Sequence, residues 1–363
     1  MDIVLWGIGN NAYNFLAKTG LYQDDKIVAL IDVDYKKWGI KIRDFIIQSP
    51  DQIRNMIYDK IIICPSQYDE IKEMLINQYM VEEDRIDNLN YFNNKIIQYL
   101  RAKYQNAHDI EAENMLDDFE KNGPSVWGSY KGRKDCYCVY RDEENHPYIM
   151  FMDKRMYFPD DYQFHTTGDD EYIENILWEQ DKDSPHLYIR SVLDEGLLEN
   201  GIIVDAGVRE GNFALQYVER ARKLYLIEPD RRWVQALEKT FRPFRDKIIL
   251  CDRLLSREND KDHISLDMFV SDKIDFLKMD IEGNEVDAIL GGKRVLSKSD
   301  AACAICSYHN MSDEENIRFL MSGLGYETTV STGYMFFLYD KYLFDHLDFR
   351  RGIVYASKKA RRR

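Results

Sequence analysis

The sequence predicts an α/β protein with a doubly wound, mostly parallel sheet in its carboxyl-terminal half and a smaller α/β domain before it. Two observations carry this prediction. Apolar runs of strand length alternate with segments of helical periodicity, and most of these runs end in an acid or a glycine turn. Strands that alternate with helices indicate a parallel sheet. We expect one domain over 1–100, a helical and irregular connection over 101–184, and a second domain over 185–363.

The composition limits the possible partners. The chain has 363 residues and a net charge of -15, which argues against nucleic acid as a partner. The basic run 358–363 is interpreted as a solvated tail. No window reaches membrane-spanning length, and the amino terminus lacks the pattern of a signal peptide. These features predict a cytoplasmic protein without a membrane span, and its oligomeric state is left open.

The six cysteines predict reduced thiols rather than disulfides. Two close pairs, Cys136 with Cys138 and Cys303 with Cys306, suggest a zinc site at first sight. Their spacing fits no zinc motif, and Cys303 and Cys306 lie in an apolar run. We therefore interpret them as buried thiols and predict no metal ligands among the cysteines.

The amino-terminal unit begins with an apolar strand, 3–6, followed by Gly7-x-Gly9-x-x-Ala12 and a helix that includes Phe15 and Leu16. The next strand ends in Asp32. Glycines at the first turn and an acid at the second strand end are typical of nucleotide-binding domains. A nucleotide or nucleotide-sugar at Gly7, Gly9 and Asp32 is one prediction. The unit spans only half of a full dinucleotide fold, so a structural role without a ligand is the alternative.

The strongest motif of the second domain is the segment 202–213, in which an apolar strand ends in Asp205, Gly207 and Gly211 form a turn, and a helix begins near Asn212. Gly207 allows a sharp turn and a close ligand. The N–H groups of the helix start favour an electronegative ligand group. A carboxylate at the strand end suits a ligand with an ammonium group, such as the methionyl part of S-adenosylmethionine.

Acids also end the next two strands of this domain. Glu228 follows the strand 223–227, where a doubly wound fold presents an acid to ribose hydroxyls. Asp252 follows the strand 247–250 and is a candidate partner of an adenine amino group, with an exposed surface acid as the alternative.

A second group of polar residues follows two later strands. The strand 274–279 ends in Asp280, and Glu282 and a glycine turn come next; the strand 302–306 leads to His309. The carboxyl ends of parallel strands share one sheet edge, so these side chains are expected to meet in the ligand crevice. Residues 326–330 and 334–338 are predicted to pair as an antiparallel hairpin at the end of the sheet. A helix is predicted to begin at Ser184.

These motifs together resemble the FkbM-type methyltransferase family. The resemblance rests on Val204-Asp205-Ala206-Gly207 with Gly211, on Ile227-Glu228-Pro229, on Leu277-Lys278-Met279-Asp280-Ile281-Glu282-Gly283, and on the run 304–309. It covers roughly residues 185–357. The family's usual Asn, two residues before the second glycine, is Arg209 here.

The resemblance implies a class I methyltransferase-like fold, S-adenosylmethionine as the cofactor, and methyl transfer to a hydroxyl oxygen of a sugar or natural product. The amino-terminal unit is similar to small Rossmann-like domains attached to sugar-modifying enzymes, which favours a glycan or activated sugar as acceptor. The residues expected to bind the cofactor are Asp205, Gly207, Gly211, Asn212, Glu228 and Asp252.

Methyl transfer by in-line displacement needs an aligned acceptor oxygen and a base that takes its proton. His309 is the first candidate for the base and Asp280 the second. A divalent cation on Asp280 and Glu282 is a less favoured version. Two other function classes stay open: an NAD-dependent or nucleotide-sugar enzyme centred on the amino-terminal unit, and a non-catalytic nucleotide-binding module.

Overall fold

The structure is a computed structural model that describes residues 1–12, 25–42, 44–128, 137–164, 171–190, 196–337 and 347–358. Phe15, Leu16 and the basic tail after Lys358 lie outside the described residues. The chain divides into two compact units: residues 1–129 with 336–349, and residues 130–335 with 350–363. The domain boundaries near residues 100 and 184 stay a prediction, since a division by contacts does not test which segments fold independently.

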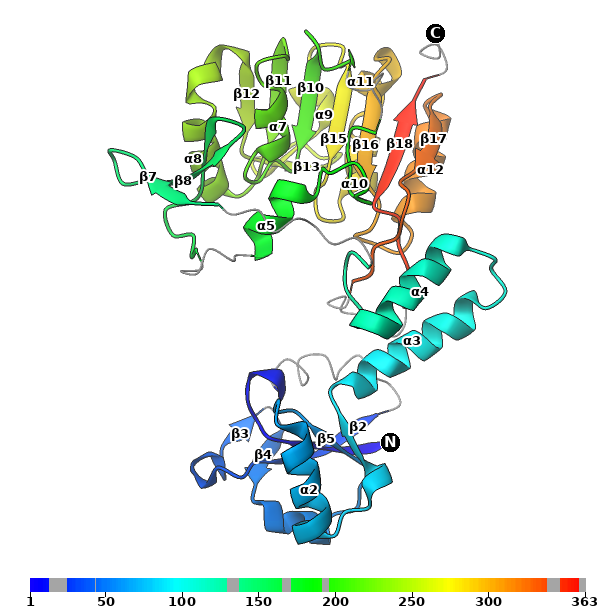
Figure 1. The fold of residues 1–363 in the computed structure, drawn as a ribbon. Helices are drawn as coiled ribbons and strands as arrows, with labels where there is room; N and C mark the ends of the chain where they lie inside the picture. The colour runs from blue at the N-terminus through cyan, green and yellow to red at the C-terminus, as the bar shows by residue number, and fades with distance from the viewer. Residues whose placement is uncertain are drawn as a thin grey trace. The chain divides into compact units, whose positions relative to one another are not determined.

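The second unit is built on a seven-stranded sheet (Figure 1). In spatial order its strands are β12 (Ile248–Cys251), β11 (Lys223–Ile227), β10 (Ile202–Ala206), β15 (Phe276–Met279), β16 (Ala302–Cys306), β18 (Ile353–Ser357) and β17 (Glu327–Val330). The pairs from β12 to β16 are parallel, whereas β18 is antiparallel to both β16 and β17. The predicted fold class, a doubly wound sheet with antiparallel end strands, is confirmed.

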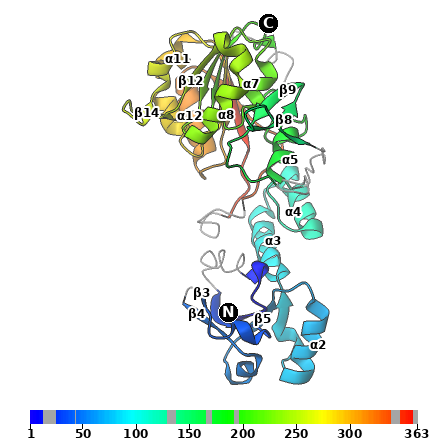
Figure 2. The same cartoon turned by 90° about the vertical axis from the view of Figure 1, so that its left-hand side faces the viewer.

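Helices cover both faces of this sheet because successive residues of each strand point to opposite sides. Ile203 packs with the first layer and Val204 with the second. The first layer consists of α5 (Glu171–Trp178), α7 (Asn212–Tyr217) and α8 (Arg231–Thr240). The second consists of α9 (Leu266–Phe269), α10 (Glu285–Leu290), α11 (Lys293–Lys298) and α12 (Asp313–Gly323). Figure 2 shows α7 to the right of the sheet and α11 and α12 to its left.

Two local predictions for this unit are wrong. The partner of β17 is β18 rather than residues 334–338, because the chain first leaves the sheet and pairs only on its return. Of the residues proposed as the second hairpin strand, Met335 makes an isolated bridge to Arg350. No helix begins at Ser184: residues 184–190 form turns and irregular structure. Pro185 suits a helix start, but it lies in a packed loop instead.

Smaller elements complete the second unit. A three-stranded antiparallel sheet comprises β7 (Val139–Arg141), β8 (Pro147–Phe151) and β9 (Lys154–Tyr157). No strands were predicted for this aromatic-rich stretch. A short parallel pair is formed by β13 (Leu254–Leu255) and β14 (His263–Ile264).

The first unit contains a six-stranded sheet of the expected α/β kind. Its strands in spatial order are β3 (Lys41–Ile42), β4 (Phe45–Gln48), β2 (Lys26–Ile31), β1 (Asp2–Trp6), β5 (Lys60–Ile63) and β6 (Ile86–Asn88). All pairs are parallel except β3 with β4. The α-helices among its described residues are α2 (Tyr68–Tyr79), α3 (Asn90–Tyr104) and α4 (Ile110–Asn122).

A segment from far along the chain completes the first unit. The ring centroids of Phe336 and Phe349 lie 5.3 and 5.8 Å from that of Phe119 on α4. Tyr104, at the end of α3, donates a hydrogen bond to the Asp348 carboxylate at 2.6 Å. The apolar faces of α3 and α4 are therefore covered in part by residues that follow β17.

Within the described residues, short 3-10 helices lie at Tyr35–Lys37, Pro50–Asn55, Glu83–Arg85 and Arg242–Lys247. Across the described part of the chain, each helix is too short or too polar to cross a membrane. The described cysteines are free thiols. Cys303 and Cys306 are buried as predicted, and Cys64 and Cys251 are buried too, but the prediction of a buried thiol is wrong for Cys138, which is exposed. Cys136 lies outside the described residues.

Candidate functional site

The turn after β10 is held close to the neighbouring strand end. Gly207 has a φ of +76°, and a Cβ there would lie 1.6 Å from the carbonyl oxygen of Asp280. Gly211 has a φ of +85°, and a Cβ there would lie 2.9 Å from a methyl carbon of Leu237. The positive φ at both positions favours glycine, as predicted. β10 and β15 are neighbouring strands, and their carboxyl ends lie at the point where the strand order reverses.

Glu228 is fixed beside this turn. One of its carboxylate oxygens accepts a hydrogen bond from the Arg209 N–H and the other from the Asp230 N–H, both at 2.9 Å. The residue is 7% exposed, and burial raises the pKa of its carboxyl. Each oxygen keeps a second lone pair, so the carboxylate is pre-oriented to accept further hydrogen bonds at the end of β11.

Asp205 forms a buried ion pair with Lys278. The two residues are register partners on adjacent parallel strands, and Asp205 Oδ1 lies 3.1 Å from Lys278 Nζ. The ammonium also donates to the Gly207 carbonyl oxygen, which ties the turn to the strand beneath it. Burial raises the pKa of Asp205, and the carboxylates of Asp205 and Asp280 raise the pKa of Lys278 against the opposing effect of burial.

Asn212 and Asp252 lie in different surroundings. Asn212 begins α7, and its side-chain amide donates to the Ile176 carbonyl at 3.3 Å and to Glu179 Oε1 at 2.8 Å. The amide therefore fastens α7 to the end of α5. Asp252 follows β12 and is exposed. Their assignment to the cofactor stays a prediction.

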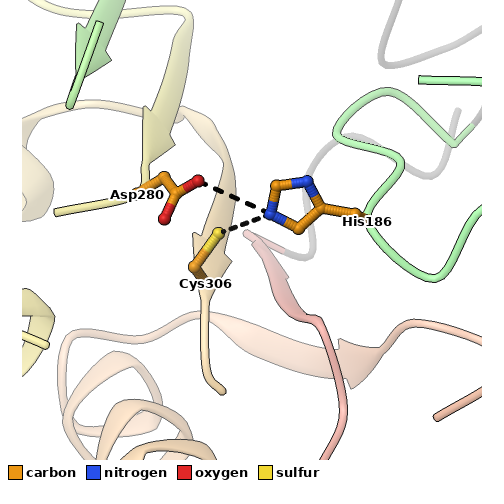
Figure 3. A group of neighbouring side chains, drawn as sticks. All are labelled: His186, Asp280 and Cys306. Atoms are coloured by element: carbon orange, nitrogen blue, oxygen red, sulfur yellow. Dashed lines mark hydrogen bonds and ion pairs between the residues drawn. The ribbon is translucent and has the colours of Figure 1, made fainter. Parts of the chain in front are cut away.

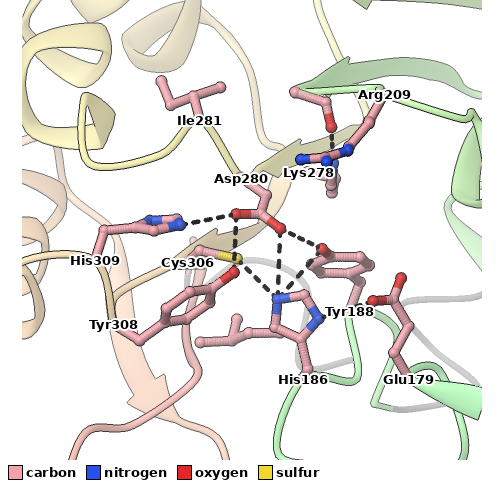
Figure 4. A network of polar contacts seen from close by, with 12 residues as sticks. Glu179, His186, Tyr188, Arg209, Lys278, Asp280, Ile281, Cys306, Tyr308 and His309 are labelled. Atoms are coloured by element: carbon pink, nitrogen blue, oxygen red, sulfur yellow. Dashed lines mark hydrogen bonds and ion pairs between the residues drawn. The ribbon is translucent and has the colours of Figure 1, made fainter. Parts of the chain in front are cut away.

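Asp280 is the centre of a polar network at the end of β15 (Figure 4). Its Oδ1 accepts a hydrogen bond from the Tyr308 hydroxyl at 3.2 Å, and its Oδ2 accepts one from the Tyr188 hydroxyl at 3.0 Å. His309 Nε2 lies 3.4 Å from Oδ1, and His186 Nε2 lies 3.5 Å from Oδ2. Burial opposes ionisation, but His186, Lys278 and His309 outweigh it and hold the pKa of Asp280 well below its usual range.

His309 lies between two carboxylates, as the sequence predicted for the shared sheet edge. Its Nδ1 is 2.9 Å from Oε1 of Glu285, a fully buried residue of α10. Glu285 and Asp280 raise the pKa of His309 against the opposing effect of burial. Glu282 contributes less, since its side chain is 79% exposed and lies 3.7 Å from His309 Nε2. The structure thus joins His309 and Asp280 closely and leaves Glu282 at the rim.

Four members of this network were not among the predicted site residues. His186, Tyr188 and Cys306 are buried and face Asp280 or one another, and Lys278 lies beneath the turn. Lys278 had a usable signal, because a lysine inside a buried apolar strand needs an anionic partner on a neighbouring strand. His186 and Tyr188 lie in a loop without periodicity, so no local pattern marks them.

Glu210, in the turn between the two glycines, is an acid held in a buried position. It is 6% exposed, and its Oε2 accepts a 2.5 Å hydrogen bond from the Tyr172 hydroxyl. Burial, with a smaller effect of Glu179, raises the pKa of Glu210 to about 7. The protonated acid therefore suits the folded protein better than the carboxylate does.

Glu210→Gln is expected to remove a pH-dependent loss of stability. The folded-state pKa lies above that of the unfolded chain, so the native protein binds more protons and its stability falls as pH rises from about 4.5 to about 7. Between about pH 5 and about pH 8, the wild type should lose about 3 kcal/mol more of its free energy of unfolding than the variant loses. Urea denaturation at both pH values measures this. The exposed Glu238→Gln on α8 is the matched control, and an equal change in both variants would contradict the assignment.

The first unit has a cavity of its own at the predicted nucleotide position. It encloses about 500 Å³, and its lining includes Gly7, Gly9, Asp32 and Lys37. Asp32 is buried, and its Oδ2 accepts from the Ile8 N–H at 2.7 Å and from Lys37 Nζ at 2.9 Å. The acid is thus already occupied by protein donors, and ligand binding here stays a prediction.

Part of the polar network lies in a segment that matches a known protein family. Residues 253–328 match the Methyltransferase FkbM domain. The FkbM resemblance seen in the sequence is confirmed for this segment, which includes Asp280, Glu282 and His309. The match supports methyl transfer as the reaction class. Residues 1–87 match a second family model, described as C2185-like, N-terminal. No curated protein matches the chain significantly.

Three solved structures with a similar fold are distant from this chain in sequence. The FkbM methyltransferase of Methylobacillus flagellatus KT is 16% identical, with 98% of this chain and 89% of that chain covered and a TM-score of 0.44. The magnesium protoporphyrin IX methyltransferase of Synechocystis PCC 6803 with bound SAM is 15% identical, with 55% and 86% covered and a TM-score of 0.35. An rRNA methylase of Streptococcus thermophilus is 18% identical, with 46% and 91% covered and a TM-score of 0.30. Scores this low bear on neither the cofactor nor the substrate.

Proposed function

We propose that this protein is an S-adenosylmethionine-dependent methyltransferase that methylates a hydroxyl oxygen of a sugar, glycan or related natural product. One observation carries the proposal: the Gly207 turn and the pre-oriented Glu228 carboxylate lie at the carboxyl edge of the sheet, where the strand order reverses and where Asp280 and His309 also meet. Open α/β sheets bind their ligands at this place.

The proposed cofactor position follows from the strand order. Glu228 at the end of β11 would accept hydrogen bonds from the ribose hydroxyls, and the turn from Gly207 to Gly211 would hold the methionyl part. Asp252, at the end of β12, is on the side expected for the adenine. In this arrangement the residues at the ends of β15 and β16 would lie on the side of the sulfonium methyl and would bind the acceptor.

The proposed reaction is an in-line displacement. The acceptor oxygen attacks the methyl carbon, the carbon–sulfur bond breaks, and the sulfonium becomes a neutral thioether. A hydroxyl is a weak nucleophile, so a base must take its proton. His309 is the favoured base because Glu285 orients its imidazole through Nδ1, which leaves Nε2 directed towards the Asp280 side. Asp280 is the second candidate.

The sugar part of the proposal rests on the first unit. Its cavity beside Gly7, Gly9 and Asp32 is large enough for part of a nucleotide-linked sugar, and Lys37, whose ammonium pairs with Asp32, lies at its wall. A cytoplasmic location would suit such an activated acceptor.

Calorimetry with S-adenosylhomocysteine tests the cofactor assignment. We expect micromolar binding by the wild type and about 10- to 100-fold weaker binding by Glu228→Ala, because hydrogen bonds to a charged acceptor contribute about 1.5 to 3 kcal/mol. Glu228 is preferred to Asp205 for this test, since truncating Asp205 leaves the buried Lys278 unpaired.

The exposed Glu238→Ala serves as the control and should bind like the wild type. Parallel titrations with NAD and a UDP-sugar probe the first unit. Binding of NAD without any binding of S-adenosylhomocysteine would move the active centre to the first unit and overturn the proposal. Equal affinity in Glu228→Ala and the wild type would remove Glu228 from the cofactor site.

A further inference from the structure

Three chemically different donor groups meet in the interior of the second unit. They are the His186 imidazole from the loop before β10, the Asp280 carboxylate at the end of β15, and the Cys306 thiol at the end of β16 (Figure 3). His186 and Cys306 are buried, and one donor atom of each group lies within 4.8 Å of the others. β15 and β16 are hydrogen-bonded neighbours, so the backbone itself places Asp280 beside Cys306.

Two of the three separations between these donors match a tetrahedral metal site, and the third is within 4.8 Å. His186 Nε2 lies 3.4 Å from Cys306 Sγ and 3.5 Å from Asp280 Oδ2. With metal–ligand bonds of about 2.0 to 2.3 Å, the donor atoms of a tetrahedral zinc site are about 3.3 to 3.6 Å apart. Both measured distances fall in this range.

Hydrogen bonding alone accounts poorly for the same arrangement. His186 Nε2 faces three groups at once: Asp280 Oδ2, Cys306 Sγ and the Tyr188 hydroxyl, the last at 3.4 Å. One ring nitrogen carries either one proton or one lone pair, so it satisfies one such partner. The nitrogen–oxygen distances of 3.4 and 3.5 Å also exceed the usual 2.7 to 3.2 Å of a hydrogen bond.

The surroundings of the three groups resemble the outer shell of a metal site. The far nitrogen of His186, Nδ1, lies 3.6 Å from Oε2 of Glu179. At this distance the carboxylate acts on the ring through its charge, and a carboxylate behind a histidine strengthens the ring as a ligand. Tyr188 donates a hydrogen bond to Asp280 Oδ2, and Tyr308 donates one to Oδ1. These two hydrogen bonds hold the Asp280 carboxylate in place as well.

We propose that His186, Asp280 and Cys306 bind a zinc ion. The thiolate is too soft a ligand for Mg²⁺ or Ca²⁺, and a nitrogen, oxygen and sulfur set suits zinc. Three protein ligands leave one of four positions open, as in catalytic zinc sites. The ligands are far apart in the sequence and fit no spacing motif, and this site is distinct from the cation on Asp280 and Glu282 considered from the sequence.

A zinc ion here would bind an acceptor hydroxyl in its open position and lower the hydroxyl's pKa. Asp280 then serves as a ligand, and His309 keeps the role of base. This use rests on the proposed function. The metal site itself does not, because metal binding is measured without cofactor or acceptor.

The test measures metal on the purified full-length protein. After dialysis against zinc and removal of excess metal, elemental analysis should find about one zinc per wild-type chain. His186→Ala and Cys306→Ser should lose it. Glu179→Gln, which keeps all three ligands, should bind zinc about 10- to 100-fold more weakly. Cobalt(II) in place of zinc should give a near-ultraviolet thiolate-to-cobalt absorption band that Cys306→Ser lacks.

Cys303→Ser is the matched control, because Cys303 is a buried thiol of the same strand that packs on the opposite face of the sheet. It should bind zinc like the wild type, and circular dichroism establishes that each variant is folded. Absence of zinc and of the cobalt band from the wild type would overturn the proposal even if a variant fails to fold. So would equal loss in Cys303→Ser and Cys306→Ser. Titrating S-adenosylhomocysteine into metal-free protein keeps the cofactor assignment separate from this result.

Discussion

Lys278→Met is expected to lower the free energy of unfolding by about 3 to 5 kcal/mol, because removing one partner of a buried ion pair leaves the other charge uncompensated. Asp205 is 1% exposed, and its carboxylate lies 3.1 Å from the Lys278 ammonium. The Asp280 carboxylate also interacts electrostatically with this ammonium. The substitution also removes the donor to the Gly207 carbonyl, so the turn loses its anchor. Urea denaturation monitored by circular dichroism measures the change.

The double variant Lys278→Met/Asp205→Leu separates the ion pair from simple packing. Replacing both charges with apolar side chains should recover most of the lost stability, since buried pairs are often replaced at little cost. The exposed Lys273→Met near the start of the same strand is the control and should change stability by less than about 0.5 kcal/mol. A Lys278→Met protein as stable as the wild type would show that Asp205 is buried in its neutral form.

His309→Ala is expected to reduce methyl transfer by about 100- to 10,000-fold while leaving the affinity for S-adenosylhomocysteine nearly unchanged. The imidazole lies at the ends of β15 and β16, whereas the predicted ribose site lies at the end of β11, so the variant spares the cofactor contacts. Transfer from S-adenosylmethionine with a labelled methyl group, to sugar acceptors found by screening, measures the rate, and calorimetry measures the affinity.

Glu285→Gln keeps the shape of the residue behind His309 and removes its charge. Its loss of turnover should be smaller than that of His309→Ala, because the ring stays in place. His263→Ala, a histidine on β14 that pairs with Asp260, is the control and should transfer methyl groups at the wild-type rate. Unchanged turnover in His309→Ala would assign the base role to Asp280 instead.

The sheet could be predicted from the sequence because its strands are short apolar runs that end in polar residues. Ile203 and Val204 are buried on opposite faces, which is why their run is uniformly apolar rather than alternating. The hairpin prediction failed because a strand pattern does not identify the strand with which it pairs. Residues 326–330 carry a strand pattern but no information on their partner, and the true partner, β18, follows after a segment that belongs to the other unit.

The candidate site was predictable to the extent that its residues follow strands. Asp205, Glu228 and Asp280 each come directly after or at the end of an apolar run, so the parallel topology brings them to one edge. His186 and Cys306 meet only through tertiary packing, since one lies in an irregular loop and the other inside a strand without a charge. No local pattern encodes a contact of that kind.

The return of residues 336–349 to the first unit has a consequence for biosynthesis. The ribosome makes α4, with Phe119 on its apolar face, roughly 200 residues before it makes Phe336 and Phe349, which cover that face. At about 5 to 20 residues per second, the face stays uncovered for about 10 to 40 seconds. During this interval the nascent chain offers an apolar helix surface to chaperones, and no single cleavage of the finished chain would release either unit intact.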